Sequence, residues 1–379
     1  MRVLWFGTYS LGGGYPRSTV LIEALRTRGV EVVECHAPLF ADARAKVDAA
    51  KGGLGALATA LRLARAWLRL CLGFFRAGPR DAVVVGYTGH VDVYLARLLS
   101  LVRRRPIVLD AFLSPWDTVV NDRALLASRS IKARALFALE RGALRLADRV
   151  LTDTGAHADF MAETFGVARD KFVPVPVGSL VDAPVPVRVG ADGASADPLR
   201  VFFCGSFVPL QGVPVILDAA LLCPEIRFRI RGDGPGAERI EEELRQRATP
   251  NVDLERRFIS REELEEELAE ADVVLGVFGT NAKTGRVVPC KVYDAFAAGC
   301  CVVTGDGAAP RELLRDGVET LLVERGSPEA LAAALRRLGA EPDLRASLAR
   351  AARAAYEQRF DRDALGGILQ GALAEACAR

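Results

Sequence analysis

The sequence predicts an α/β protein of two doubly wound domains that face each other across a cleft. Short apolar, β-branched runs alternate with longer segments of helical period, as in a parallel sheet buried on both faces. The alternation stops at residue 178 and restarts at residue 200. The 379 residues also exceed what one hydrophobic core usually organises. Ligands of such sheets bind at the carboxyl ends of the strands.

In the first domain, predicted over residues 1–178, six apolar runs predict strands: "RVLWFG", "EVVEC", "AVVVGY", "PIVLDAF", "RVLTDT" and "KFVPVPVG". Residues 179–199 are rich in Pro, Gly, Ala and Asp and lack periodicity, which predicts a linker. In the second domain, predicted over residues 200–359, six more runs follow: "LRVFFCG", "IRFRIRGDG", "NVDLERRF", "DVVLGVFG", "CCVVTGD" and "TLLVERG". We expect a terminal helix, at about residues 360–379, to pack back on the first domain.

Composition excludes several classes of protein. The formal net charge of +2 is too small for general attraction to nucleic acid, so a charged ligand needs a local cluster of charge. The eight cysteines include no CxxC pair, which predicts a reducing cytoplasm and no metal site. The amino terminus does not resemble a secretory signal, and no apolar run reaches the ~18 residues that a membrane-spanning helix needs.

Several motifs occur in a characteristic order. The second half contains "VFFCGSFVPLQGVPVILDAALL", then "FRIRGDGPGAERIEEEL", then "VVPCKVYDAFAAGCCVVTGD". These segments resemble the nucleotide-sugar-binding half of retaining glycosyltransferases of the GT-B fold, specifically the group 1 or family 4 enzymes. In the first half, "GTYSLGGGYPRSTVLIEALRTRGVEVVEC" and "ERGALRLADRVLTDTGAHADFMAETFG" are similar to the same family. The resemblance implies two Rossmann-like domains, with the donor on the second and the acceptor against the first.

The loop between Gly205 and Gly212 departs from the family pattern. The family usually has a basic residue after the first glycine and a lysine before the second, and both hold the donor diphosphate. Here these positions are Ser206 and Gln211, which carry no charge. We still assign Gly205, Ser206 and Gln211 to donor binding because the resemblance places this loop at the diphosphate.

The acidic motif of the family is also altered. Asp294 stands where the family's second acid accepts hydrogen bonds from the ribose of the donor, and Arg286 replaces the first acid, which faces the transferred sugar. Lys283, Arg286 and Lys291 could restore the charge that the glycine loop lacks. We therefore assign Lys283 and Arg286 to catalysis, as cations that stabilise the departing diphosphate, and Lys291 and its neighbour Val292 to donor binding. The alternative is that these cations are solvated loop charges.

Other donor contacts follow from glycine-rich turns and from the resemblance. Gly13 and Gly14, with Arg17 just inside the following helix, predict an anion site, although an ordinary tight turn explains a glycine run equally well. Gly232 lies in a turn that the resemblance places near the nucleotide. The resemblance alone places the base at Arg257 and Phe258.

In the first half, two residues at strand ends are candidates for catalysis or acceptor binding. Asp110 ends an apolar strand, and we favour it over Asp117 and Asp122, for which surface capping is the simpler explanation. His90 also follows a strand, although a loop histidine is more often incidental. His36 and His157 attract no functional argument.

Residues 54–80 contain no acid and predict an amphipathic helix with Arg62, Arg65, Arg69 and Arg76 at helical spacing. Such a helix can lie on an anionic membrane, and Arg103, Arg104 and Arg105 could extend the basic surface. The alternative is a helix that packs on the sheet with its arginines in solvent.

The function that we expect is transfer of a sugar, by a hexosyl- or related glycosyltransferase, from a nucleoside-diphosphate sugar to an acceptor hydroxyl with retention of configuration. The product would be a cell-surface glycan, a glycolipid or a glycosylated metabolite. We expect no cofactor and no metal, and a cytoplasmic location at the inner face of the membrane if the acceptor is lipid-linked. One alternative is a catalytically silent GT-B protein that binds nucleotide sugars or acts as a scaffold; another is a sugar epimerase or phosphorylase.

Overall fold

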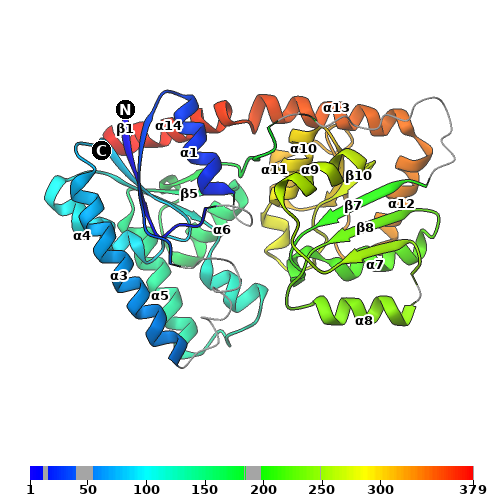
Figure 1. Cartoon of the computed structure of the whole chain (residues 1–379), viewed down its shortest axis with the longest axis horizontal. Helices are drawn as coiled ribbons and strands as arrows, with labels where there is room; N and C mark the ends of the chain where they lie inside the picture. The colour runs from blue at the N-terminus through cyan, green and yellow to red at the C-terminus, as the bar shows by residue number, and fades with distance from the viewer. Residues whose placement is uncertain (12–15, 40–53, 183, 185–197, 248, 379) are drawn as a thin grey trace. The chain divides into compact units, whose positions relative to one another are not determined.

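The computed structural model describes residues 1–379 except 12–15, 40–53, 183, 185–197, 248 and 379. The chain divides into two compact units, shown in Figure 1. Unit 1 comprises residues 1–120, 126–176 and 362–379, and unit 2 comprises residues 121–125 and 177–361. The observed division therefore lies within about two residues of the predicted boundaries at 178 and 360, except that residues 121–125 belong to unit 2.

Unit 1 contains a six-stranded sheet in the order β2-β1-β3-β4-β5-β6, and every neighbouring pair is parallel. Its strands are β1 (Arg2–Gly7), β2 (Glu31–His36), β3 (Ala82–Val85), β4 (Ile107–Phe112), β5 (Arg149–Thr152) and β6 (Phe172–Pro174). Its helices are α1 (Arg17–Thr27), α3 (Leu54–Arg76), α4 (Asp92–Arg103), α5 (Ile131–Leu146), α6 (Gly155–Phe165) and α14 (Arg362–Ala378). All six predicted strands are present.

The core of unit 1 lies between this sheet and its helices. Strands β3 and β4 are buried along their whole length, which explains why their sequences are uninterrupted apolar runs rather than alternating ones. Helix α3 contributes Ala66, Leu70 and Phe74 to the same core. The prediction that this helix packs on the sheet is confirmed for that face.

The terminal helix α14 packs against α1 in unit 1. Leu365 and Leu369 are buried on its inner face. The helices approach so closely at Gly366 that a Cβ there would lie 2.3 Å from the carbonyl oxygen of Ala24. Gly367, the next residue, has no atom within 4 Å of the same hypothetical position. Close packing therefore requires glycine at residue 366 only.

Unit 2 contains a second parallel sheet of six strands, in the order β12-β11-β10-β7-β8-β9. Its strands are β7 (Arg200–Cys204), β8 (Arg227–Arg231), β9 (Val252–Glu255), β10 (Val273–Leu275), β11 (Cys301–Gly305) and β12 (Leu321–Val323). Its helices are α7 (Val213–Leu222), α8 (Ala237–Arg247), α9 (Arg261–Glu270), α10 (Cys290–Ala298), α11 (Ala308–Leu313), α12 (Pro328–Ala340) and α13 (Pro342–Arg359). The predicted strands are again all present.

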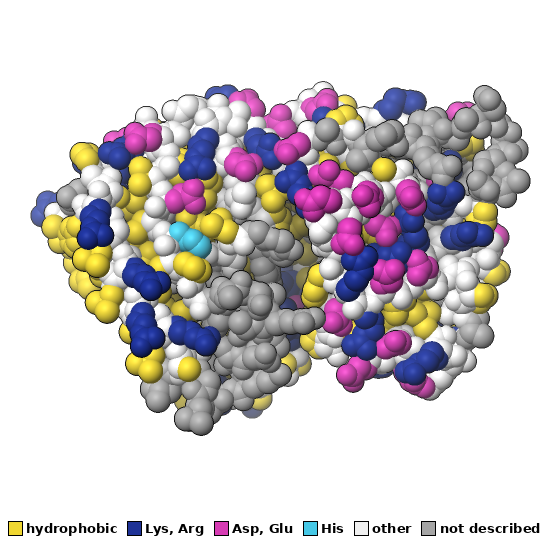
Figure 2. Space-filling model, in the orientation of Figure 1, with side chains coloured by type: hydrophobic (Ala, Val, Ile, Leu, Met, Phe, Trp, Pro, Cys, Tyr) yellow, Lys and Arg dark blue, Asp and Glu magenta, His cyan; other side chains and the backbone are white. Residues whose placement is uncertain are grey.

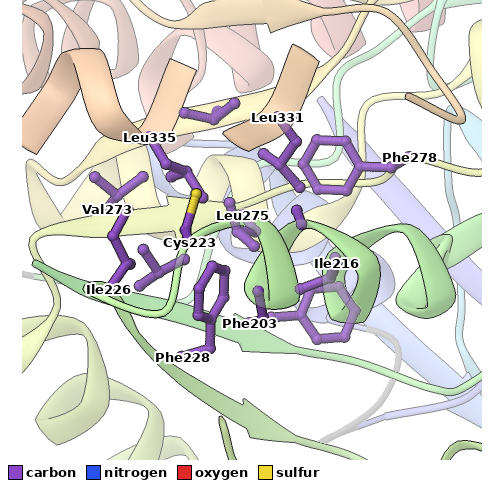
Figure 3. Close-up of a cluster of buried hydrophobic side chains, with 14 of the residues drawn as sticks. Phe203, Ile216, Cys223, Ile226, Phe228, Val273, Leu275, Phe278, Leu331 and Leu335 are labelled. Atoms are coloured by element: carbon purple, nitrogen blue, oxygen red, sulfur yellow. The ribbon is translucent and has the colours of Figure 1, made fainter. Parts of the chain in front are cut away.

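Helices α7 and α12 cover one face of the second sheet. Figure 3 shows Ile216 of α7 and Leu331 and Leu335 of α12 packed over Phe203 and Leu275 of the strands, and all five side chains are buried. Each buried Leu, Ile or Phe contributes roughly 1.5–3 kcal/mol relative to its exposed state. This apolar layer fixes the strands, and the strands fix the loops at their ends. The predicted class, two doubly wound α/β domains, is confirmed.

None of the helices in the described part of the chain combines the length and the apolar character that crossing a membrane requires.

The substitution Gly366→Ala tests the packing of α14 on α1. The new methyl group would meet the backbone of Ala24, so we expect a lower melting temperature, with a cost of about 1–3 kcal/mol typical of overpacking. Gly367→Ala is the matched control, because it adds the same methyl group in open space and should stabilise the helix by up to ~1 kcal/mol. Equal melting temperatures for the two variants would contradict this packing.

Candidate active site

The strand order of unit 2 identifies the edge where a ligand should bind. The chain begins this sheet at β7, continues outward to β8 and β9, and then returns to the other side of β7 with β10. The order therefore reverses between β7 and β10. In open parallel sheets, ligands bind beside such a reversal, at the carboxyl ends of the strands.

The loop after β7, Gly205–Gly212, interlocks with the loop after β8. The amide of Phe207 donates to the carbonyl of Asp233 at 3.0 Å. A Cβ at Gly232 would lie 1.9 Å from the carbonyl oxygen of Gly205, so only glycine allows this contact. Gly212 has a φ of 69°, a conformation that favours glycine. These glycines therefore shape the loops, whatever else they contact.

The loop after β7 is also bonded to the segment after β10. The amide of Phe278 donates to the carbonyl of Gln211 at 3.1 Å, and the amide of Gly279 donates to that of Leu210 at 3.2 Å. The Thr284 hydroxyl donates to the side chain of Asn281 at 2.8 Å. Backbone hydrogen bonds therefore hold the two sides of the strand reversal together.

Lys291, the second residue of α10, directs its amine into the loop after β7. The Nζ atom donates to Oε1 of Gln211 at 2.6 Å and lies 3.6 Å from the centre of the Phe203 ring. A Cβ at Gly205 would lie 2.7 Å from the same Nζ. Burial lowers the pKa of Lys291 to about 8, because the charged amine has lost most of its hydration. The loop that lacks its own cation therefore receives one from α10.

Asp294 lies three residues further along α10. Its Oδ1 accepts a hydrogen bond from the Ser179 hydroxyl at 2.6 Å. Burial raises the pKa of Asp294 to about 6, and the hydrogen bond from Ser179 and the nearby cations oppose that rise. Val292, between Lys291 and Asp294, has a buried side chain and belongs to the interior. Its assignment to donor binding is not supported for the side chain.

Lys283 and Arg286 lie in the segment after β10, which contains the short 3₁₀ helix η4 (Thr284–Arg286). Lys283 is buried, and its Nζ lies 3.9 Å from a carboxylate oxygen of Asp122, which also accepts a 2.7 Å hydrogen bond from Asn281. Asp122 therefore neutralises part of the charge of Lys283. Arg286 is partly exposed, and its Nε is buried. Neither side chain is a solvated loop charge.

Arg325 is a cation at this edge that the sequence analysis did not consider. It follows β12, is partly buried, and donates from Nη1 to the carbonyl of Asn281 at 3.0 Å. No local motif marks it, because its partner is 44 residues away in the chain.

Arg257 and Phe258 follow β9. The guanidinium of Arg257 pairs with Glu255 at 2.8 Å and Glu263 at 2.7 Å, and its backbone amide donates to the carbonyl of Glu255 at 3.0 Å. The Phe258 side chain is 63% exposed. Their contact with a nucleobase stays a prediction.

In unit 1, Arg17 and Asp110 form a buried ion pair. Arg17 is 1% exposed, and its Nε donates to Oδ1 of Asp110 at 2.8 Å. Its other nitrogens donate to the carbonyls of Val175 at 2.8 Å and Thr152 at 3.2 Å. Burial raises the pKa of Asp110, although Arg17 opposes the rise. Both groups hold strand ends together, and the assignments of Arg17 to a donor anion and of Asp110 to catalysis stay predictions. Gly13 and Gly14 lie outside the described residues.

The histidines of unit 1 also differ from expectation. His90 is buried, and burial lowers its pKa to about 4, so its ring is neutral at physiological pH. Its assignment to catalysis stays a prediction. His157, which we had set aside, lies 2.8 Å from Asp153 through Nδ1, and both side chains are buried. The four-residue spacing at the start of α6 is the signal that sequence analysis missed.

Within the described ranges, no group of three or more His, Cys, Asp or Glu side chains is arranged to hold a metal ion. All eight cysteines are free thiols.

Taken together, the structure brings Gly205, Gln211, Gly232 and Lys291 to one point, with Asp294 three residues further along the same helix. Ser206 lies in the same loop and is partly exposed. Lys283, Arg286 and Arg325 lie on the other side of the strand reversal. These cations and the single ribose candidate, Asp294, form an edge suited to a ligand with both negative charge and hydroxyl groups.

Comparison with known proteins shows what this chain is similar to. Residues 198–341 match the family model described as glycosyl transferases group 1. A curated relative, D-inositol 3-phosphate glycosyltransferase of Geodermatophilus obscurus, is 28% identical over 277 residues, which are 68% of this chain. The match spans only 60% of that relative's length.

Two solved structures share the fold. HepE of Anabaena, in complex with UDP, has a TM-score of 0.68 and 17% identity, and the match covers 99% of this chain and 100% of that one. Sucrose-phosphate synthase of Thermosynechococcus elongatus has a TM-score of 0.71 and 16% identity, with coverage of 100% and 99%. At these identities the likeness shows the fold alone. Residues 198–341 are therefore similar to the group 1 glycosyl transferases, and the chain shares the two-domain α/β fold of these two structures.

Proposed function

We propose that the protein transfers a sugar from a nucleoside-diphosphate sugar to an acceptor hydroxyl with retention of anomeric configuration. The observation that carries this proposal is the amine of Lys291 at the loop after β7, beside Gln211 and Gly205. The fold relative HepE is described in complexes with UDP and with UDP-glucose, which makes a UDP-sugar the first donor to test. The curated relative acts, by its name, on an inositol phosphate.

The chemistry follows from the charge that the reaction creates. The bond between the anomeric carbon and the β-phosphate oxygen breaks, and its electron pair leaves with the diphosphate. Lys291 is placed to stabilise this charge, and a diphosphate there would also lie near the positive end of the α10 dipole. The acceptor oxygen bonds to the anomeric carbon, and its proton passes to a phosphate oxygen, as the family resemblance implies. Asp294 would accept hydrogen bonds from the ribose.

The protein's own cations take the role that a metal ion has in other transferases, so the reaction that we propose needs no metal. Among these cations we assign the principal role to Lys291, because Asp122 partly neutralises Lys283. Arg286 stays a candidate cation for stabilising the departing diphosphate.

A membrane-linked acceptor is the finer part of the proposal. The outer face of α3 exposes apolar side chains, and arginines flank them: Leu61, Leu68, Leu72 and Phe75, with Arg62, Arg65, Arg69 and Arg76. Figure 2 shows basic and hydrophobic side chains intermixed over the region of α3 and α4, whereas acidic and basic side chains alternate over the visible face of unit 2. We propose that this face of α3 contacts the anionic inner surface of the cytoplasmic membrane and that the acceptor is lipid-linked.

Substitution of Lys291 tests the donor site. Lys291→Met should reduce the turnover of a UDP-sugar by about 100-fold or more, as the loss of a preorganised donor to developing charge does. Because burial lowers the pKa of Lys291, its charged form destabilises the fold, so the melting temperature should stay equal or rise. Arg239→Ala, which removes an exposed cation of α8 that pairs with Glu243, is the control. Full turnover by Lys291→Met would refute the assignment.

The pH dependence of donor affinity gives a second test. Affinity for an intact UDP-sugar should be highest between about pH 6, where Asp294 takes up a proton, and about pH 8, where Lys291 loses one. Below this window the ribose loses its acceptor, and above it the diphosphate loses its cation. Asp294→Asn should flatten the acidic limb, and Lys291→Arg should extend the basic limb. Constant affinity from about pH 5 to about pH 9 would contradict both roles.

Vesicle binding tests the membrane proposal. The protein should co-sediment with phosphatidylglycerol vesicles at low salt and not with phosphatidylcholine vesicles. Replacing Arg62, Arg65 and Arg69 by Gln should weaken this binding on the order of 100-fold, at about 1 kcal/mol per charge. Leu68→Ser with Leu72→Ser should weaken it at all salt concentrations, whereas the matched pair Leu221→Ser with Leu222→Ser on α7 should not. Binding that survives the arginine replacements would refute the surface.

A further inference from the structure

The loop after β12 carries a cation, Arg325, that the proposed mechanism does not use. All strands of this sheet are parallel, so Arg325 lies at the same carboxyl edge as the loops after β7 and β10. One hydrogen bond holds its side chain, and another holds the backbone of the next residue. Nη1 donates to the carbonyl of Asn281 at 3.0 Å, and the amide of the next residue, Gly326, donates to the carbonyl of Phe278 at 3.0 Å. The loop after β12 is therefore tied to the segment after β10.

Two glycines make room for this side chain. A Cβ at Gly285 would lie 3.1 Å from Nη2 and 3.3 Å from Nη1 of Arg325. A Cβ at Gly305, the last residue of β11, would lie 2.6 Å from Cγ of Arg325. The guanidinium therefore lies against bare backbone directly before Arg286. The aliphatic part of the Arg325 side chain is enclosed and its guanidinium is hydrogen-bonded, so the side chain is held in one position. This lowers the entropic cost of binding an anion.

The charge of Arg325 has no carboxylate partner within 4 Å among the described residues. Arg325 contributes to the lowered pKa of Asp306, but Arg311 contributes most and Arg325 least. Arg311 bonds both oxygens of that carboxylate, at 2.6 Å and 2.5 Å. A guanidinium has five N–H donors, and the protein uses one of them here. A partly buried cation whose charge is not balanced by a nearby carboxylate favours an anionic ligand.

We propose that Arg325 binds an anionic oxygen of the donor substrate. This inference rests on the proposed function, since it places the donor along the edge between the loops after β7 and β12. The planar guanidinium suits two groups of the same chemistry: a phosphate oxygen of the diphosphate, or a carboxylate on the transferred sugar. In the second case the donor is a nucleoside-diphosphate hexuronate, and Arg325 determines the class of sugar that is accepted.

Calorimetric titration distinguishes these sources. UDP, GDP and ADP are compared first, and the one that stabilises the wild-type protein most is chosen. The three ligands are then that nucleoside diphosphate, its conjugate with a neutral hexose and its conjugate with a hexuronate. Arg325→Ala should weaken binding by about tenfold or more for each ligand whose anion it contacts. Arg325→Lys should restore only part of the affinity, because lysine lacks the planar fork. Arg336→Ala, which breaks an exposed ion pair with Glu225 at 2.9 Å, is the matched control.

The outcomes separate cleanly. Weaker binding of all three ligands assigns Arg325 to the diphosphate, and weaker binding of the hexuronate alone assigns it to the sugar carboxylate. Unchanged affinity for all three, with only a lower melting temperature, would show that Arg325 merely clamps the loops and would overturn the inference while the proposed function stands. A wild-type protein that binds none of the three nucleotides would refute the proposed function itself.

Discussion

The proposed donor site depends on the buried ammonium of Lys291. A charged amine loses hydration when it is buried, and this loss lowers the pKa of Lys291 to about 8. Three surroundings compensate in part: the amide oxygen of Gln211, the face of the Phe203 ring and the nearby carboxylate of Asp294. None of them is a formal ion pair. The amine therefore keeps most of its capacity to bind an anion, and a diphosphate would provide the negative charge that no ion pair supplies here.

This constraint explains the departures in the glycine loop. A cation at position 206 or 211, added to Lys291, would place two positive charges at one buried point and raise the desolvation cost. Gln211 instead accepts the hydrogen bond of the lysine and fixes its orientation. Gly205 leaves the space that the amine occupies, since a Cβ there would lie 2.7 Å from it. The uncharged loop and the displaced lysine are thus parts of one arrangement.

The fold was predictable in full at the level of strands, because buried parallel strands are continuous apolar runs and leave a local signal. Candidate site residues could be proposed from the sequence only where a short motif marks them, as at Gly205 and Asp294. Lys283 with Asp122, Arg17 with Asp110, and Arg325 with Asn281 are pairs between distant parts of the chain. No local pattern encodes them, and the charge of one member gives no information about its partner. For this reason the sequence analysis assigned Arg17 to a ligand and passed over Arg325.

Arg17 in unit 1 is held differently from Lys291 and Arg325 in unit 2, and the difference supports unit 2 as the proposed anion-binding unit. In unit 1, Arg17 meets a carboxylate and the ends of two strands, so its charge and its donors are consumed by the architecture. In unit 2, Lys291 and Arg325 are held by neutral oxygens, which position a cation without cancelling it. A buried cation that is paired with a carboxylate has its charge compensated within the protein, whereas one that is positioned by neutral groups costs stability until an anion arrives. That cost is the physical reason to look for the ligand of unit 2 among dianions.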